Sequence, residues 1–166
     1  MYKRQVNASS EQLEKECFVE DTLAILKEYD FPASQLWIEI TERCRDLPIS
    51  MIKKTVTAFR EAGIHITMDD YGTGSSSSQM MLELPVEGVK IDMFFVKDIL
   101  EEKKKQALVI GMINFANAAD LKICIEGIEN DSLESYLRQF DVTCFQGYHY
   151  SRSICQDELM KLLIKP

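Results

Sequence analysis

The sequence lacks long hydrophobic runs. No apolar stretch among its 166 residues approaches the ~20 that a membrane-spanning helix needs, and residues 1–5 lack the apolar segment of a signal peptide. Linkers rich in Pro, or in Gly and Ser, are also missing. We therefore expect a soluble, cytoplasmic protein without a membrane segment, folded as one domain whose 46% hydrophobic composition allows a sizeable core.

Cysteine pairs and excess positive charge are lacking too. The five cysteines include no Cys-x-x-Cys pair, and their odd number fits a reducing compartment, so we predict that they are small core residues. A net charge of −8 argues against binding of DNA, RNA or anionic membranes. A ligand that carries phosphate would need a local basic cluster, a helix N-terminus or metal ions. The cysteines are Cys17, Cys44, Cys124, Cys144 and Cys155.

Short apolar runs alternate with longer stretches of helical periodicity, which is typical of parallel βα units. About six such units leave two architectures open, a doubly wound sheet and a (β/α) barrel. Neither Gly-x-Gly-x-x-Gly nor a Walker-type loop follows the first strand, which weighs against the nucleotide-binding doubly wound sheets. The expected strands are Arg4 to Asn7, Leu36 to Thr41, Ile64 to Asp69, Gly88 to Asp92, Lys122 to Glu126 and Thr143 to Gln146.

Helix-capping residues separate these strands. Ser9 and Gln12 form a capping-box pattern, which predicts one helix that continues through Lys27 until Pro32 stops it. Gly63 is the expected C-terminal cap of the next helix. The expected helices are 9–27, 50–63, 103–119, one that begins at Asn130 or Asp131, and 157–164.

Nearly every apolar run ends on a carboxylate or an amide, and in a barrel these strand ends converge on one rim. Each such residue could simply cap the next helix. However, Glu is a poor N-cap, and crowded carboxylates raise one another's pKa unless a cation neutralises them. The set is Asn7, Glu39, Asp69, Asp70, Asp92, Glu126 and Gln146.

The set predicts a site for a hard divalent cation. Its ligands all carry oxygen donors, and neither His65 nor His149 lies at a strand end, which favours Mg²⁺ or Mn²⁺ over zinc. The adjacent Asp69 and Asp70 could bridge two ions ~3.5–4 Å apart. Lys90 lies between apolar neighbours in its strand. It either forms a salt bridge to a carboxylate of the next strand or holds its ammonium beside the metal site, where it orients water or stabilises phosphate charge.

Several segments together resemble the EAL domain family, in the family's order and spacing across the whole chain. The catalytic loop, Asp69-Asp70-Tyr-Gly-Thr-Gly74, is similar to the family's Asp-Asp-Phe-Gly-Thr-Gly. The other matching segments are Asn7-Ala-Ser, Glu39-Ile-Thr-Glu42, Lys90-Ile-Asp92, Glu126-Gly-Ile-Glu129 and Gln146-Gly-Tyr148.

The resemblance implies hydrolysis of cyclic di-GMP to linear pGpG with two Mg²⁺ or Mn²⁺ ions, in bacterial second-messenger signalling. Lys90 and Glu126 would be catalytic, and Asn7, Glu39, Asp69, Asp70 and Glu126 would be ligands of the metals or their waters. Glu42, Asp92, Glu129 and Gln146 would bind substrate or support the site.

The family's first strand, which carries its Glu-x-Leu motif, is not in these residues. The resemblance therefore implies a partial EAL domain over residues 1–166: an α/β fold, an incomplete TIM-like (β/α) barrel with about six parallel strands and the first strand missing. Such an open barrel would expose two strand edges and a hydrophobic interior.

We expect weak activity or none from this chain alone. The alternatives are a non-catalytic module that binds cyclic di-GMP or a protein partner, and another barrel enzyme that acts on phosphorylated metabolites. A homodimer and an upstream sensor or cyclase domain are further expected partners.

Overall fold

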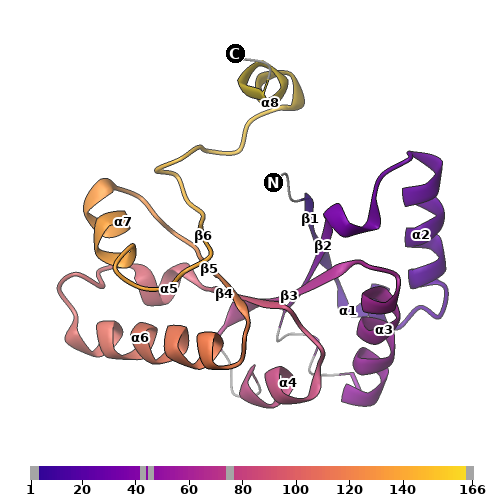
Figure 1. Cartoon of the computed structure of the whole chain (residues 1–166), viewed down its shortest axis with the longest axis horizontal. Helices are drawn as coiled ribbons and strands as arrows, with labels where there is room; N and C mark the ends of the chain where they lie inside the picture. The colour runs from indigo at the N-terminus through magenta and orange to yellow at the C-terminus, as the bar shows by residue number, and fades with distance from the viewer. Residues whose placement is uncertain (1–3, 42–43, 45–46, 74–76, 164–166) are drawn as a thin grey trace.

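The six strands form one parallel sheet whose spatial order follows the chain (Figure 1). The computed structural model describes residues 4–41, 44, 47–73 and 77–163. A doubly wound sheet reverses its strand order, whereas this one does not, so the prediction of an incomplete TIM-like barrel is confirmed. The strands are β1 (Arg4–Ala8), β2 (Leu36–Thr41), β3 (His65–Tyr71), β4 (Gly88–Ile91), β5 (Lys122–Ile125) and β6 (Cys144–Phe145).

Helices connect successive strands and cover one face of the sheet (Figure 1). None of the described helices is long and apolar enough to span a bilayer. The helices expected from the sequence did not include the short helix Met93–Val96. The helices are α1 (Ser10–Leu13), α2 (Phe18–Glu28), the 3₁₀ turn η1 (Ala33–Gln35), α3 (Ile49–Glu61), α4 (Ser77–Glu83), α5 (Met93–Val96), α6 (Lys103–Ala118), α7 (Asp131–Leu137) and α8 (Gln156–Leu163).

Two predicted helix caps are present. Gln12 N donates to Ser9 Oγ at 3.3 Å while Ser9 N donates to Gln12 Oε1 at 3.0 Å, which closes the capping box. Gly63 has φ 83° and follows α3, where Gly63 N bonds to Arg60 O. Ile64 N also bonds to Phe59 O, which completes a Schellman motif that satisfies the last carbonyls of α3.

The prediction of one helix from Ser9 through Lys27 is wrong, because the chain turns between Leu13 and Phe18. Both helices contact α3: Leu13 is 2% exposed, and the Phe18 ring meets the Phe59 ring edge-on at 5.1 Å. A straight helix would not bring both side chains onto α3, so packing overrides helical propensity here.

Alternation along the strands separates an apolar layer from a polar one. Side chains such as Ile38, Ile66 and Ile91 are at most 1% exposed and belong to the core beneath the helices. Their neighbours Glu39, Thr67 and Lys90 face the barrel interior and are also buried. The expected hydrophobic interior is therefore wrong for the described residues, because the inward positions are mostly polar.

The sheet is open at both edges. Among the described strands, β1 pairs only with β2 and β6 only with β5, as expected for an incomplete barrel. The side chains from Arg4 to Asn7 are exposed. Beyond β6, all described side chains from Ser151 to Leu162 are exposed, and Figure 1 shows α8 apart from the sheet.

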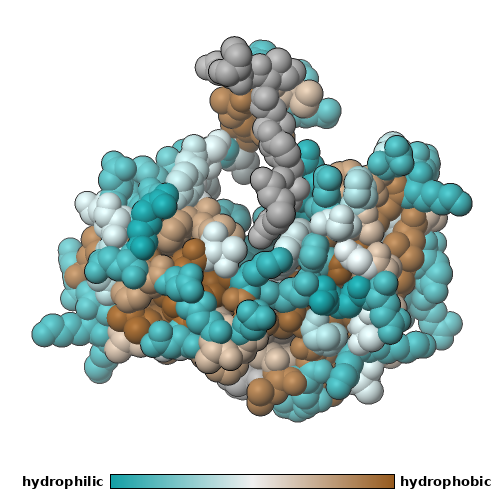
Figure 2. Space-filling view, viewed as in Figure 1, coloured by the Kyte–Doolittle hydropathy of each residue, from teal (hydrophilic) through white to brown (hydrophobic). Residues whose placement is uncertain are grey.

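Apolar surface gathers on the α5 and α6 side of the molecule (Figure 2). Phe94 is 66% exposed and Met93 51%. The cysteines are divided: Cys44 and Cys124 are buried, whereas Cys17 and Cys155 are exposed. The prediction that the cysteines are core residues is therefore wrong for Cys17 and Cys155, which lie in the loop before α2 and next to α8.

Candidate active site

Lys90 is the centre of the polar interior. Its side chain lies on β4, and Nζ is 2.7 Å from Glu126 Oε1 and 3.0 Å from Glu39 Oε1. A third carboxylate, Asp69 Oδ1, lies 3.1 Å from the same nitrogen. Four neighbouring strands thus deliver one ammonium and three carboxylates to one point, so Lys90 both forms salt bridges and lies within the predicted ring.

Strand register explains why these residues meet. Asn7 is the register partner of Glu39, and Thr41 is the partner of Asp69. Glu126 follows β5 directly, and its backbone N donates to Ile91 O at 3.1 Å, which continues the β4–β5 pairing by one residue. Since parallel strands end at the same rim, polar residues at their carboxyl ends converge.

The backbone at Asp69 and Asp70 departs from a regular strand. The pairing of β3 with β4 shifts between Met68 and Tyr71, and Asp70 has φ 54°. The other described non-glycine residues with positive φ each follow a helix, where this conformation is common, whereas Asp70 lies within a strand.

Local hydrogen bonds hold this conformation in place. Asp70 N donates to Asp69 Oδ1 at 3.0 Å, and Thr73 N and Oγ1 donate to Asp70 O at 3.2 and 2.9 Å. A left-handed non-glycine residue costs about 1–3 kcal/mol and persists where its surroundings enforce it, often at functional sites.

Glycines let the loops beside Glu126 pack closely. Gly127 has φ 75°, and a Cβ there would lie 2.5 Å from the Cβ of Met93. A Cβ on Gly147 would lie 2.1 Å from the carbonyl oxygen of Ile128. Neither position accommodates a side chain. The packing around the site therefore requires the glycine that follows Glu126 and the glycine that follows Gln146.

The cluster carries excess negative charge. Three carboxylates contact one ammonium, which leaves two negative charges uncompensated among these four groups. Burial raises the pKa of Glu126; Asp69 and Glu39 add to this effect, while Lys90 opposes it. Burial alone would lower the pKa of Lys90, but Glu126, Asp69 and Glu39 outweigh burial and raise it, so the ammonium stays charged.

The donor set suits a hard divalent cation. Carboxylate oxygens from Glu39, Asp69 and Glu126 meet there, and oxygen ligands are those that Mg²⁺ and Mn²⁺ prefer. Asn7 lies next to Glu39 in register, on the exposed edge strand. The excess negative charge gives a cation a reason to bind, so the residues present fit the metal that the family resemblance implies.

A separate cluster has its donor atoms closer together. The cluster consists of Asp131, Glu134 and His149, and one potential ligand atom from each lies within 4.8 Å of the other two. Among the residues that the structure describes, no other three His, Cys, Asp or Glu side chains are this close. His149 Nε2 lies 3.0 Å from Glu134 Oε2. Arg138 also binds Glu134, so one guanidinium already supplies positive charge to this cluster.

The remaining predicted residues divide into different environments. Asp92 caps α5, since its Oδ1 accepts from Phe94 N at 2.7 Å, so the helix-cap alternative is correct for this residue. Gln146 is exposed at the rim, and its backbone N donates to Ile125 O at 2.8 Å. Glu129 is exposed. Glu42 lies outside the described residues.

Two contacts near the site were missed from the sequence. Gln5 Nε2 donates to Glu39 Oε1 at 2.5 Å. The sequence could have indicated this contact, because Gln5 lies two residues before Asn7 and strand residues two apart share a face. Cys124 and Cys144 are register partners in the interior. A hydrogen bond with Cys144, and then burial, raise the pKa of the Cys124 thiol.

The opposite end of the barrel is built from packing contacts. His65, at the start of β3, stacks on Trp37 with ring centroids 4.4 Å apart, and its Nδ1 contacts Glu87. Lys122 Nζ lies 4.8 Å from the centroid of the Trp37 ring. These contacts make His65 a packing residue away from the site.

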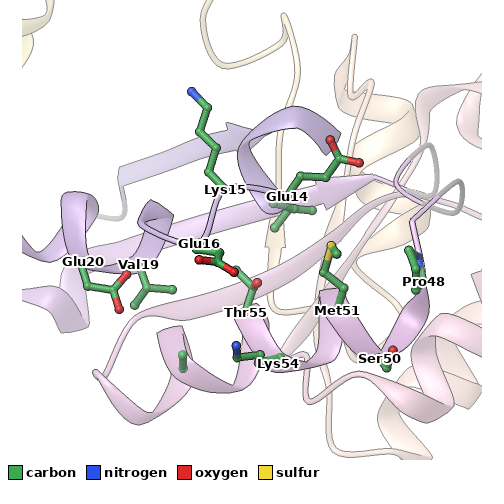
Figure 3. Close-up of a pocket in the computed structure, with 12 residues that line it drawn as sticks. Glu14, Lys15, Glu16, Val19, Glu20, Pro48, Ser50, Met51, Lys54 and Thr55 are labelled. Atoms are coloured by element: carbon green, nitrogen blue, oxygen red, sulfur yellow. The ribbon is translucent and has the colours of Figure 1, made fainter.

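A cavity of about 490 Å³ lies away from the cluster, between the α1–α2 turn and α3 (Figure 3). Figure 3 shows Lys54 and Thr55 of α3 facing Glu16 and Val19 across it. Of the predicted site residues that the structure describes, none lines this cavity, so it is not the candidate active site.

Together these observations define a parallel (β/α) half-barrel with an acidic, lysine-centred site at the carboxyl ends of its strands. The chain belongs to the EAL family: the family profile "EAL domain" matches residues 2–153.

Relatives and solved structures agree with this assignment. The chain is 32% identical to the uncharacterized protein sll1895 of Synechocystis sp., over 95% of this chain and 23% of that protein. It is 28% identical to the cyclic di-GMP phosphodiesterase PA2567 of Pseudomonas aeruginosa, over 93% of this chain and 26% of that protein. The structure of the EAL enzyme Bd1971 in its cAMP- and cyclic-di-GMP-bound form superimposes with a TM-score of 0.92 at 29% identity, over 97% of this chain and 43% of that one.

The chain thus spans about a quarter of the length of these curated relatives.

Proposed function

We propose that this chain is part of an EAL domain that hydrolyses cyclic di-GMP to linear pGpG. The observation that carries the proposal is the meeting of Glu39, Asp69 and Glu126 at Lys90 Nζ. A relative named as a cyclic di-GMP phosphodiesterase and a similar structure with bound cyclic di-GMP support the choice of substrate.

Hydrolysis adds water to one phosphodiester of the cyclic dinucleotide. The water oxygen forms a bond to phosphorus, the bond from phosphorus to a ribose oxygen breaks, and that oxygen takes up a proton. Glu126 is the proposed acceptor of the proton from water, because burial raises its pKa and its oxygen lies 2.7 Å from Lys90 Nζ. Lys90 remains charged, orients Glu126 and stabilises negative charge on the phosphate.

Two divalent cations complete the proposal. Asn7, Glu39, Asp69, Asp70 and Glu126 would hold them. When bound, they would supply charge stabilisation at the phosphate and lower the pKa of the attacking water. Gln146 and Glu129, exposed at the rim, are the proposed supporting contacts to substrate.

One observation favours the second candidate, a module that binds cyclic di-GMP or a protein without turnover. Lys90 occupies the space between the three carboxylates and already compensates part of their charge. A cation must displace or share these contacts. Further proposed partners are another protein, a second copy of the chain and a preceding sensor or cyclase domain.

Turnover by the 166-residue chain separates the two candidates. We expect weak conversion of cyclic di-GMP to pGpG, detected by chromatography, and only with Mg²⁺ or Mn²⁺. Glu126→Gln should lower the rate at least about a hundredfold, in the range attributed to general acid–base catalysis. Glu101→Gln, which changes an exposed glutamate, is the matched control and should keep the wild-type rate.

Full activity of Glu126→Gln would contradict its assigned role. Nucleotide binding that persists in EDTA, with no product, would establish the binding module instead. Absence of both nucleotide binding and product would overturn both roles in cyclic di-GMP chemistry and leave binding of a protein partner as the second candidate.

A further inference from the structure

Two cysteine thiols face each other in the barrel interior. Cys124 of β5 and Cys144 of β6 are direct register partners, and their side chains are in hydrogen-bond contact. Neighbouring strands lie about 4.8 Å apart. A disulfide requires a Cα separation of roughly 4.4–6.8 Å, and the usual spacing of neighbouring strands falls within this range.

The pair differs from the other cysteines. Cys17 and Cys155 are exposed near helix termini, and Cys44 is buried in the segment before α3. Cys124 is buried, whereas Cys144 is partly exposed, so Cys144 is the more accessible of the two residues.

A small cavity borders both cysteines. It measures about 30 Å³ and is lined by Cys124, Cys144, Lys90 and Thr67, among others. A site for one water molecule needs roughly 10–15 Å³ on this measure. The cavity therefore has room for a molecule of about the size of hydrogen peroxide next to the two thiols.

We propose that Cys124 and Cys144 form an oxidative modification site that hydrogen peroxide converts into a reversible disulfide. The Cys144 sulfur attacks one peroxide oxygen, the O–O bond breaks, and a sulfenic acid forms with release of water. The Cys124 sulfur then attacks the Cys144 sulfur and displaces the hydroxyl as a second water. Two thiols are oxidised and one peroxide is reduced to two waters.

The disulfide joins the sheet where its pairing is shortest. β6 comprises only Cys144 and Phe145, and it is held by β5 alone among the described strands. Cys124 and Cys144 each lie two residues before a candidate site residue, Glu126 and Gln146. The covalent bond therefore fixes β6 and the spacing of these two strand ends directly beneath the rim, and it does so whether or not the chain hydrolyses cyclic di-GMP.

Tryptic peptide mapping tests the proposal without ambiguity. Cleavage after Lys122, Arg138 and Arg152 gives peptides 123–138 and 139–152, which contain Cys124 and Cys144 as their only cysteines. A disulfide joins the two peptides with loss of two hydrogens, whereas a missed cleavage after Arg138 leaves them joined with a mass one water below the sum, so the mass separates the two cases. After treatment of the folded chain with peroxide and alkylation of free thiols, we expect the linked pair, two hydrogens lighter than the sum of its parts, as the main oxidised product. Dithiothreitol should release both peptides.

Three controls sharpen the result. The variant Cys17→Ser/Cys44→Ala/Cys155→Ser keeps the pair and should give the same product. Cys124→Val removes one sulfur and should abolish the linked peptides, with circular dichroism to show that it folds. In urea, wild-type protein should give mixed pairings, because the native register is lost.

Oxidation that leaves peptides 123–138 and 139–152 unlinked in the folded wild type would overturn the proposal. Linkage of Cys144 mainly to Cys17 or Cys155 would do the same. The oxidised wild type should also melt at a higher temperature than the reduced form, and this difference should be absent in Cys124→Val; an equal shift in that variant would show that another modification is responsible.

Discussion

Lys90 and Glu39 are the two buried charged side chains among the described residues, and they contact each other. Removing one partner of a buried ion pair leaves an uncompensated charge. The resulting loss of stability is larger than the net stabilisation that the intact pair provides. Lys90 faces three carboxylates, so its loss would leave all three without the cation they share.

Lys90→Met should lower the free energy of unfolding by about 3 kcal/mol, as for other broken buried ion pairs. Millimolar Mg²⁺ should restore part of this loss, because a divalent cation can replace the ammonium among the carboxylates. Urea unfolding with and without Mg²⁺ measures both effects.

Lys53→Met, at an exposed position of α3, is the control and should change stability by less than about 0.5 kcal/mol. Equal stability of the two variants would mean that the lysine-centred network does not stabilise the fold. If Mg²⁺ raised the free energy of unfolding of Lys53→Met and Lys90→Met by the same amount, the effect would be a non-specific salt effect.

At the scale of elements, α3 connects the N-terminal helices to the sheet. Phe59 is fully buried on α3 and meets Phe18 of α2 edge-on, while Ile52 and Val56 complete the same buried face. Aromatic pairs of this geometry add to the energy of burial. The turn between α1 and α2 exists because both helices pack on this face.

Phe59→Ala should therefore destabilise the chain by about 3–5 kcal/mol, the usual cost of truncating a buried Phe. Met51→Ala changes a 39% exposed side chain of the same helix and should cost far less. Urea denaturation followed by circular dichroism compares the two variants, and similar midpoints would show that α2 and α3 do not depend on the Phe18–Phe59 contact.

At the scale of the whole molecule, the open sheet leaves β1 with one unpaired edge. Exposed strand edges promote pairing with another chain, and charged residues on an edge oppose it. Val6 on β1 is 49% exposed, and apolar Met93 and Phe94 add a second exposed region on the α5 side.

We expect the 19.1 kDa chain to self-associate as its concentration rises, which light scattering after size-exclusion chromatography would detect. Val6→Lys should reduce this association by charging the β1 edge. If Phe94→Ser reduces it while Val6→Lys has no effect, the α5 surface rather than the strand edge is the contact. A constant mass of 19.1 kDa would contradict the expectation.

Local patterns in the sequence were sufficient for much of this fold. The capping box at Ser9, the glycine cap at Gly63 and the strand from Leu36 to Thr41 could be predicted because each depends on a few neighbouring residues. Oxygen donors at strand ends likewise predicted one acidic site on one rim, because parallel strands end together.

Contacts between distant residues were decided only by the tertiary structure. Strand register and the shift at Asp70 determine that Lys90 meets three carboxylates, whereas Asp92, which belongs to the same sequence pattern, caps a helix instead. The facing thiols of Cys124 and Cys144 are 20 residues apart and depend on the pairing of β5 with β6. Periodicity assigns a residue to a face, but packing and register determine which residues on that face touch.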